Sequence, residues 1–401
     1  MINEIKFKGS KLEIQLEAQT PILHFQPDTA GATVRASEVK PKLDKFLIKK
    51  LEKETGKKLK ELKKDKKYEE YFIGKEKEKT DALRYKMQIF VEEEPCSYVA
   101  GVSNNYDIFF GNKGNGAKKK AVFSNPIVSV KCFHPELRKL IEKNIEEFFL
   151  IMNFGTMQGK GFGCFAPENI VKDGKLDDEK AQIIGSALKE NAEASVCYYR
   201  RLPSFGKSDN TWDSRNEYCI KVFKEIKNFY GGLKSGRSND ASLYHYFNRY
   251  ISKNRNYKNE TDWMKEAVRS DSSDTRHVRF VRVMLGLSST YGKGDITWRV
   301  NDANKEIERV PSPIYFKIIG DRIFVVAKKV PVEVYNRKFF FQKMKAIKGF
   351  GGRTKYERVG RGFPVFSLKE NELDLQKLLK AYVGECNKSL DENCRYVEVR
   401  E

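Results

Sequence analysis

An amphipathic helix that runs directly into a glycine-rich loop sets the tightest limit on the fold of this chain. Apolar residues recur at intervals of three and four throughout 135–153, so one face of this helix must be buried. The loop that follows, 155–163, contains four glycines and leads into a short apolar strand. A helix, a glycine loop and a strand in direct succession predict a mixed α+β domain in which the helix packs on a sheet.

Alternating polar and apolar residues predict strands around this helix. The expected strands of the first half are 5–17, 20–25, 86–91 and 121–131. Residues 33–51 have helical spacing, with Ser37 as a candidate N-cap and Pro41 in the first turn. The chain is therefore expected to begin with a strand, a loop and a helix.

The second half repeats this mixture of elements. Its expected elements are strands at 196–199, 278–283, 314–319 and 323–327, a hairpin turn at 320–322 and a helix at 374–383. Residues 207–274 show no strand alternation, which favours a helical insertion or linker. The similar halves suggest a duplicated α+β domain, divided into 1–200, 201–275 and 276–401. A Lys/Glu-rich segment at 49–79 is interpreted as a solvated helix or mobile insertion.

The charge of the chain points to a polyanionic partner. Its 401 residues carry 76 Lys and Arg against 55 Asp and Glu, a formal charge of +21. Nucleic acid is favoured as the partner, because cations that neutralise phosphates release counterions and so gain affinity. An acidic protein, a membrane surface or mere solubility are the alternatives. A hydrophobic content of 40% excludes a wholly disordered chain, and no apolar run is long enough to span a membrane. We expect a cytoplasmic protein.

Cysteine and histidine spacing argues against a metal site. The seven cysteines are scattered without a C-x-x-C pair, and no two of the four histidines lie three or four residues apart. Neither a disulfide framework nor a zinc knuckle is supported. We expect no cofactor and no catalytic metal.

The glycine loop differs from the familiar nucleotide-binding loops. It lacks the G-K-[ST] ending of a P-loop, and it follows a helix, whereas a dinucleotide fingerprint follows a strand. Glycines let a backbone approach a bulky ligand, so the main-chain N–H groups are expected to face phosphates. The residues concerned are Gly159, Lys160, Gly161, Phe162 and Gly163. A plain turn with glycines at positive φ is the alternative.

Two further cationic segments of the first half are candidate phosphate contacts. Arg35, Ser37, Lys40 and Lys42 lie where a strand gives way to a helix, whose N-terminus favours anions. For Arg35 the alternative is a surface ion pair with Glu38. The second segment is the flexible cationic loop 111–120, which ends in Lys118, Lys119 and Lys120.

The second half contains cations interleaved with aromatic residues. Its cations are Lys343, Lys345, Lys348, Arg353, Lys355, Arg358 and Arg361, around Phe350, Tyr356 and Phe363. Bases of single-stranded RNA stack on rings while cations follow the backbone, so this pattern favours an RNA surface. An unpaired basic loop is the alternative.

Several of these segments together resemble the RAMP proteins of CRISPR effector complexes. Thr20-Pro21-Ile22-Leu23, the helix start at 35–43 and the glycine loop ending at 161–165 are similar to the family's strand, helix and "G-[KR]-G-[FY]-G" motifs. Residues 283–287 and 309–318 resemble elements of the two-domain subunit that caps the Cmr-type (type III-B) effector. Pro41 and Ser288 depart from the family's usual glycine and proline.

The resemblance implies two ferredoxin-like domains with helical insertions. It also implies a non-catalytic subunit that holds guide RNA, or the guide–target duplex, near one end of the effector. The implied partners are guide RNA, target RNA and other RAMP subunits. The alternatives are a metal-independent guide-processing endoribonuclease and a stand-alone RNA-binding protein. His24 and Asp28 lie where such a nuclease could place catalytic groups, but a packed imidazole and a turn-forming Asp are preferred for them, so no catalytic residue is assigned.

Overall fold

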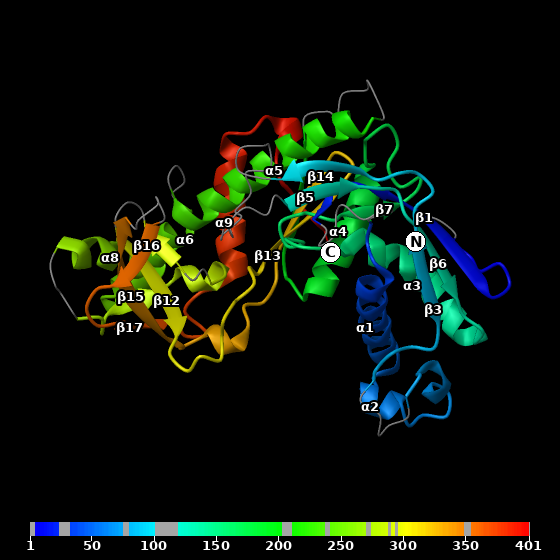
Figure 1. Ribbon diagram of the computed structural model, residues 1–401, viewed down its shortest axis with the longest axis horizontal. Helices are drawn as coiled ribbons and strands as arrows, with labels where there is room; N and C mark the ends of the chain where they lie inside the picture. Colours follow the sequence, from blue (N-terminus) through cyan, green and yellow to red (C-terminus); the bar gives the residue numbers. More distant parts are fainter. Residues whose placement is uncertain are drawn as a thin grey trace.

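In the part of the chain that the structure describes, the strands form four β-sheets with helices packed on them (Figure 1). The structure is a computed structural model that describes residues 5–23, 33–74, 80–100, 119–202, 211–236, 241–269, 274–287, 290–292, 296–348 and 354–400. Helices and strands are mixed along the chain, and most strand pairings are antiparallel, so the α+β class predicted from the sequence is confirmed.

The first sheet combines strands from the first 170 residues. All of its pairings are antiparallel, and its order is β3-β6-β1-β7. In chain order the elements are β1 (Lys11–Ala18), α1 (Ala36–Thr55), β3 (Lys86–Phe90), β6 (Ile127–Lys131), α3 (Pro135–Ile151) and β7 (Phe165–Pro167). This strand-helix-strand-strand-helix-strand succession places the first strand between the third and the fourth.

A second sheet repeats this succession with segments from across the chain. Its order is β13-β14-β8-β18, again antiparallel throughout. The elements are β8 (Cys197–Arg201), α5 (Trp212–Ser235), β13 (Ile314–Ile319), β14 (Arg322–Ala327), α9 (Leu375–Lys388) and β18 (Val397–Glu398). The expected turn at Gly320 is confirmed. Both orders fit a split βαβ unit, while the ferredoxin-like assignment and the division at 200 and 275 stay predictions.

The largest sheet is inserted into this second succession, between α5 and β13 and between β14 and α9. Its order is β11-β12-β15-β17-β10-β9, and β16 pairs with the end of β15. The strands are β9 (Lys258–Asn259), β10 (Val278–Phe280), β11 (Thr290–Gly292), β12 (Ile296–Asp302), β15 (Lys338–Lys348), β16 (Thr354–Arg358) and β17 (Phe363–Ser367). Helix α8 (Glu260–Arg269) lies beside this sheet (Figure 1).

The remaining elements are one long helix, α4 (Asp178–Ala192), and several short segments. The short segments are β2 (Ile22–Leu23), β4 (Cys96–Ala100), β5 (Lys119–Phe123), α2 (Leu59–Leu62), α6 (Leu243–Tyr246), the π-helix Phe247–Ser252, α7 (Lys253–Arg255) and 3-10 turns at 69–71, 282–285, 332–334 and 392–394. Strands β2, β5 and β4 form the fourth sheet. No helix in the described ranges is long and apolar enough to cross a membrane.

The segment 49–79, interpreted as a solvated helix or mobile insertion, begins with the end of α1, where Lys49 and Lys53 are exposed, but its later described part is packed. Leu62, Tyr71 and Phe72 are at most 4% exposed. The Phe72 backbone bridges to Leu83, and the Lys63 ammonium lies 5.8 Å from the Phe72 ring. Apolar residues spaced among the lysines therefore build a small packed lobe after α1.

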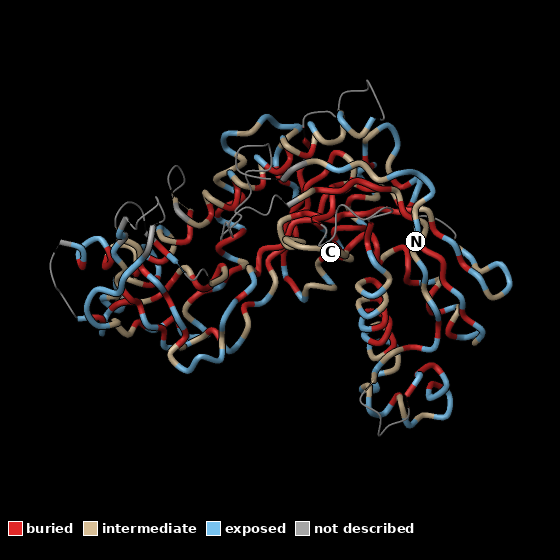
Figure 2. Tube along the Cα trace, viewed as in Figure 1, coloured by how far each residue is buried: buried red, intermediate tan, exposed pale blue. Residues whose placement is uncertain are grey.

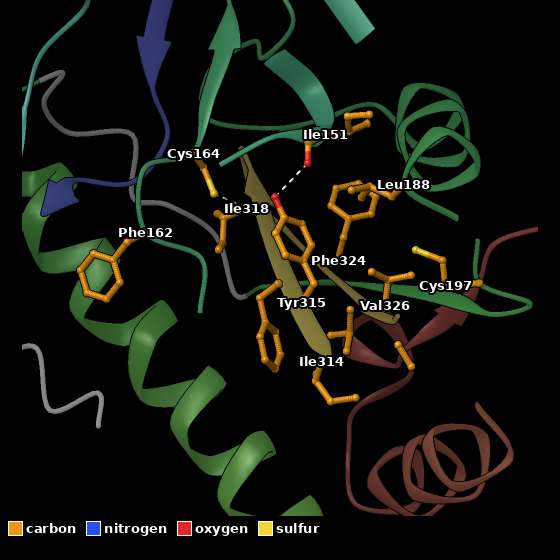
Figure 3. Close-up of a cluster of buried hydrophobic side chains, with 14 of the residues drawn as sticks. Ile151, Phe162, Cys164, Leu188, Cys197, Ile314, Tyr315, Ile318, Phe324 and Val326 are labelled. Carbon is orange, nitrogen blue, oxygen red and sulfur yellow. Dashed lines mark hydrogen bonds between the residues drawn. The ribbon is translucent and has the colours of Figure 1, made fainter. Parts of the chain in front are cut away.

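The first and second sheets share one core (Figures 2 and 3). The hydroxyl of Tyr315 on β13 donates to the carbonyl oxygen of Ile151 at the end of α3, 2.9 Å away. The buried ammonium of Lys317 donates to the carbonyl oxygens of Phe149 and Met152 at 2.8 and 2.7 Å. These bonds satisfy carbonyls at the end of α3, which no further helical turn could reach.

Candidate nucleic-acid interface

The start of α1 divides its four candidate residues into two exposed and two inward-facing ones. Arg35 is the N-cap residue, with an extended backbone and no side-chain capping bond. The prediction that Ser37 caps the helix is therefore wrong, because Ser37 lies inside the first turn. Both side chains are exposed. The Glu38 carboxylate, offered as the alternative partner of Arg35, pairs with Lys42 at 2.8 Å.

Lys40 and Lys42 are bonded within the protein. The Lys40 ammonium pairs with Asp44 at 2.8 Å, donates to a backbone carbonyl at 3.0 Å and lies 4.3 Å from the Tyr85 ring. Besides Glu38, the Lys42 ammonium contacts the carbonyl oxygen of Asn153 and the side-chain oxygen of Gln158, at 3.1 and 2.8 Å. These two lysines hold α1 against its neighbours.

The glycine loop also packs inward. The N–H of Gly161 donates to the carbonyl oxygen of Gln158, and the N–H of Gly163 to that of Pro21. Both glycines have positive φ, +88° and +65°. A Cβ on Gly163 would lie 2.0 Å from the carbonyl oxygen of Phe154. These two N–H groups are thus used inside the protein, and the glycines permit a tight turn.

The side chains of the glycine loop pack on α5, the helix that belongs to the succession of the second sheet. Phe162 is fully buried and stacks on Phe223 of α5, with ring centroids 4.1 Å apart. The Lys160 ammonium lies 2.9 Å from the centroid of the Tyr230 ring. Burial lowers the pKa of Lys160 to about 6, so this amine is largely neutral at pH 7. Gly159 accepts a bond from the Phe316 backbone and has open space where a Cβ would lie.

A surface pocket of about 370 Å³ lies between α1 and α4 and is rich in lysine. Lys49 pairs with Glu193 at 2.9 Å, and Lys50 and Lys53 both reach Glu190, at 3.3 and 3.1 Å. Carboxylates from α4 therefore neutralise the cations of this pocket, which weakens its attraction for phosphate.

The large sheet has one face covered by a helix and one open face. Trp263 of α8 packs on the covered face, with ring centroids 5.2 Å from Trp298, 6.0 Å from Phe341 and 5.4 Å from Phe363. Because side chains alternate along a strand, Phe340 between the buried Phe339 and Phe341 faces the other way.

The residues of the open face are related by strand register. Phe340 lies opposite Asn301 on one side and Pro364 on the other, Lys338 opposite Phe366, and Met344 opposite Arg358. Paired residues in a ladder share a face. The open face therefore carries Arg299, Lys338 and Arg358 as exposed cations and Phe340, Phe366 and Tyr356 as exposed rings.

The charge of this open face is not balanced within the described chain. Among the strand residues that the structure describes on it, there is no Asp or Glu. No ion pair joins Arg299, Lys338 or Arg358 to a described carboxylate; Arg358 donates to the carbonyl of Gly360 at 3.3 Å. Unneutralised cations on an open surface attract a polyanion.

The structure separates the residues predicted in the second half. Lys343 lies opposite Trp298, and Lys345 opposite Ile296 and Glu357, so both belong to the covered face beyond the end of its core. Arg358 and Tyr356 are on the open face. The backbones of Lys348 and Lys355 are in β15 and β16, and their side chains lie outside what the structure describes, as do Arg353 and Phe350.

The candidates from loop 111–120 are placed only in part. Lys120 is half-buried on β5, and the backbone of Lys119 begins that strand. The Lys119 side chain, all of Lys118, and His24 and Asp28 lie outside the described residues. Within the described ranges, no group of three or more His, Cys, Asp or Glu residues could hold a metal ion.

Sequence reasoning missed Lys338, Arg299, Phe340 and Phe366. Their signal is the alternation itself: three consecutive phenylalanines at 339–341 cannot all face one side of a strand. One ring had to be exposed or covered by another element.

Comparisons with known proteins agree on a family. The family model of the Cmr1 N-terminal domain matches residues 9–237, and that of the Cmr1 C-terminal domain matches residues 240–400. The chain belongs to the Cmr1 family. Membership of the Cmr1 family implies a subunit of a type III-B CRISPR effector and agrees with the RAMP resemblance of the sequence.

Structural similarity to a solved Cmr1 protein is weaker. The crystal structure of Cmr1 from Pyrococcus furiosus in its apo form shares 13% sequence identity with this chain, at a TM-score of 0.40. The match covers 97% of this chain and 98% of the other. A comparison with curated proteins finds no match.

Proposed function

We propose that this Cmr1-family chain is a non-catalytic subunit that binds RNA within a type III-B effector. In this role it holds guide RNA, or the guide–target duplex, near one end of the complex, beside other RAMP subunits. The observation that carries the proposal is the open face of the large sheet, where Arg299, Lys338 and Arg358 are exposed without an opposing carboxylate among the described strand residues.

Exposed residues outside the open face are further candidate phosphate contacts. Arg35 and Ser37 lie exposed at the N-terminus of α1, where the helix dipole favours an anion. Lys345 is exposed at the far end of β15. Lys40, Lys42 and the glycine loop face inward, so we assign them a structural role and no contact with RNA. They position the helix start that carries Arg35 and Ser37.

A gel-shift experiment tests the proposal and separates it from the nuclease alternative. The purified full chain is incubated without added metal with labelled single-stranded repeat RNA, and the RNA is then analysed on a denaturing gel. We expect a shifted band that contains intact RNA. Cleaved RNA would support the endoribonuclease, and the absence of any shift would overturn RNA binding.

A further inference from the structure

The open face of the large sheet exposes aromatic rings in a protein that buries most of its phenylalanines. Phe340, Phe366 and Tyr356 are 37%, 41% and 53% exposed. The residues that alternate with them, Phe339, Phe341 and Val365, are fully buried on the other face. Exposed apolar surface that is concentrated on one face marks a site of interaction.

The three rings lie on one face of the sheet, on β15 and on the two strands, β17 and β16, that pair with the same edge of it. Phe340 and Phe366 are diagonal neighbours, since Phe340 is opposite Pro364 and Phe366 is opposite Lys338. Tyr356 is opposite Ala346, six residues farther along β15 than Phe340, which is about 20 Å at the rise of a strand. The open face thus presents rings at two separated points, Phe340 with Phe366 near the start of β15 and Tyr356 beside its far end.

Cations flank these rings. The Lys338 ammonium lies 5.4 Å from the centroid of the Phe340 ring. Arg358 is two residues from Tyr356 on the same strand face, and Arg299 is next but one to Asn301, the residue opposite Phe340. A ligand that fits here has flat apolar faces and a negative backbone.

We propose that this face binds single-stranded RNA by stacking bases on Phe340, Phe366 and Tyr356 while Arg299, Lys338 and Arg358 contact the phosphates. The inference rests on the proposed function and narrows it. Bases of a duplex are stacked on one another and cannot offer their faces to protein rings, whereas unpaired bases can. This face therefore holds an unpaired part of guide or target RNA.

The chain offers a matched control for the rings. Phe133 is 72% exposed, and the Lys131 ammonium lies 5.4 Å from its ring centroid, much as Lys338 lies over Phe340. It follows β6 of the first sheet, outside the proposed surface. Phe133→Ala removes a ring that lies beside a lysine and is even more exposed than Phe340 and Phe366.

The experiment measures binding of the full chain to a fluorescein-labelled single-stranded RNA of mixed sequence, and to the same RNA annealed to its complement, by fluorescence anisotropy. Phe340→Ala with Phe366→Ala should weaken binding of the single strand about tenfold or more. Duplex binding and the salt dependence of single-strand binding should change little, because no cation is removed. Phe340→Trp with Phe366→Trp should restore single-strand affinity, and Phe133→Ala should have no effect.

Three results would overturn the stacking inference. Phe340→Leu with Phe366→Leu binding like the parent chain would show that apolar surface suffices without rings. Equal loss for single strand and duplex would show no preference for unpaired bases. Normal RNA binding of the double Ala variant, with loss of incorporation into the effector complex, would assign the face to a protein partner.

Failure of the broader function gives a different result. If Arg299→Ala with Lys338→Ala and Arg358→Ala weakens RNA binding while the ring variants do not, the proposed RNA-binding function is supported and the stacking inference is overturned. If neither set has an effect, the open face is not an RNA surface at all. Circular dichroism and melting temperature of each variant confirm that these exposed substitutions leave the fold intact.

Discussion

Two regions of the molecule are rich in cations: helix α1 with the adjoining glycine loop, and the open face of the large sheet. In the first region several cations are paired or buried, whereas in the second they are exposed without carboxylate partners in the described part of the chain. In the first region, Lys42, Lys50 and Lys53 have carboxylate partners within 3.3 Å, and Lys160 is buried against a ring. On the open face, Lys338 and Arg358 have no carboxylate partner among the described residues. A high net charge therefore does not locate a binding surface; the local balance of charges does.

The same contrast holds for the motifs. The loop ending Gly161-Phe162-Gly163 is the more recognisable in sequence, yet its contacts are internal. Phe340 and Phe366 belong to no motif and are exposed. In this Cmr1-family chain, the recognisable glycine loop connects the first sheet to α5 and β13 of the second succession. The proposed RNA surface lies on the large sheet.

The largest expected effect is a loss of folding stability when the glycine loop is changed. Gly163→Ala should destabilise the protein by more than about 3 kcal/mol, because it adds a Cβ against the Phe154 carbonyl at a positive φ. Gly159→Ala in the same loop meets no atom within 4 Å and should change stability by much less. Chemical denaturation measures both. A stable Gly163→Ala variant would contradict the structural role of the loop.

Removing the open-face cations should have the next largest effect. Arg299→Ala with Lys338→Ala and Arg358→Ala should weaken single-stranded RNA binding more than tenfold. The slope of log affinity against log salt concentration should become less negative by about 2, because each lost phosphate contact changes that slope by roughly 0.7. Anisotropy titrations at several salt concentrations measure both quantities. An unchanged slope would show that these cations touch no phosphate.

Lys160 should make stability depend on pH. Its pKa is lowered to about 6 in the folded protein from 10.5, so between these values the unfolded chain binds the extra proton. Stability should rise with pH across that window by at most about 1.4 kcal/mol per unit and be insensitive to this group below it. Lys160→Met should remove the rise in urea unfolding measured from pH 6.5 to 9. Parallel pH profiles for the two proteins would argue against a buried amine.

The smallest effect is expected for the paired lysines of α1. Lys49→Ala with Lys53→Ala breaks pairs to Glu193 and Glu190 that are about half exposed, and such pairs contribute less than about 1 kcal/mol each. RNA affinity and its salt dependence should stay unchanged in the titrations used for the open face. A loss of affinity like that of the open-face variant would remove the contrast between the two regions.

Local pattern was sufficient for much of the fold. The helix predicted at 135–153 is α3 at Pro135–Ile151, and the hairpin predicted around Gly320 forms between β13 and β14. It was insufficient for 207–274, whose helix α5 carries Phe229, which packs on Phe316 of β13 and Tyr382 of α9. Helical periodicity shows that a face is apolar but not which distant element covers it.

The sequence by itself determined the periodic elements, the family motifs and the excess of positive charge, because each of these depends on neighbouring residues or on a count. The tertiary structure decided which cations are neutralised and which rings are exposed. Lys50 bonds to Glu190, which is 140 residues away in the chain, and a Cβ on Gly161 in the glycine loop would clash with Ile318 of β13. Alternation in β15 divides its phenylalanines between two faces, but only the packing of Trp263 on Phe341 decides which face is covered. Which cations are paired and which face is covered depend on contacts between residues far apart in the chain. A local sequence pattern does not show which distant segments come together.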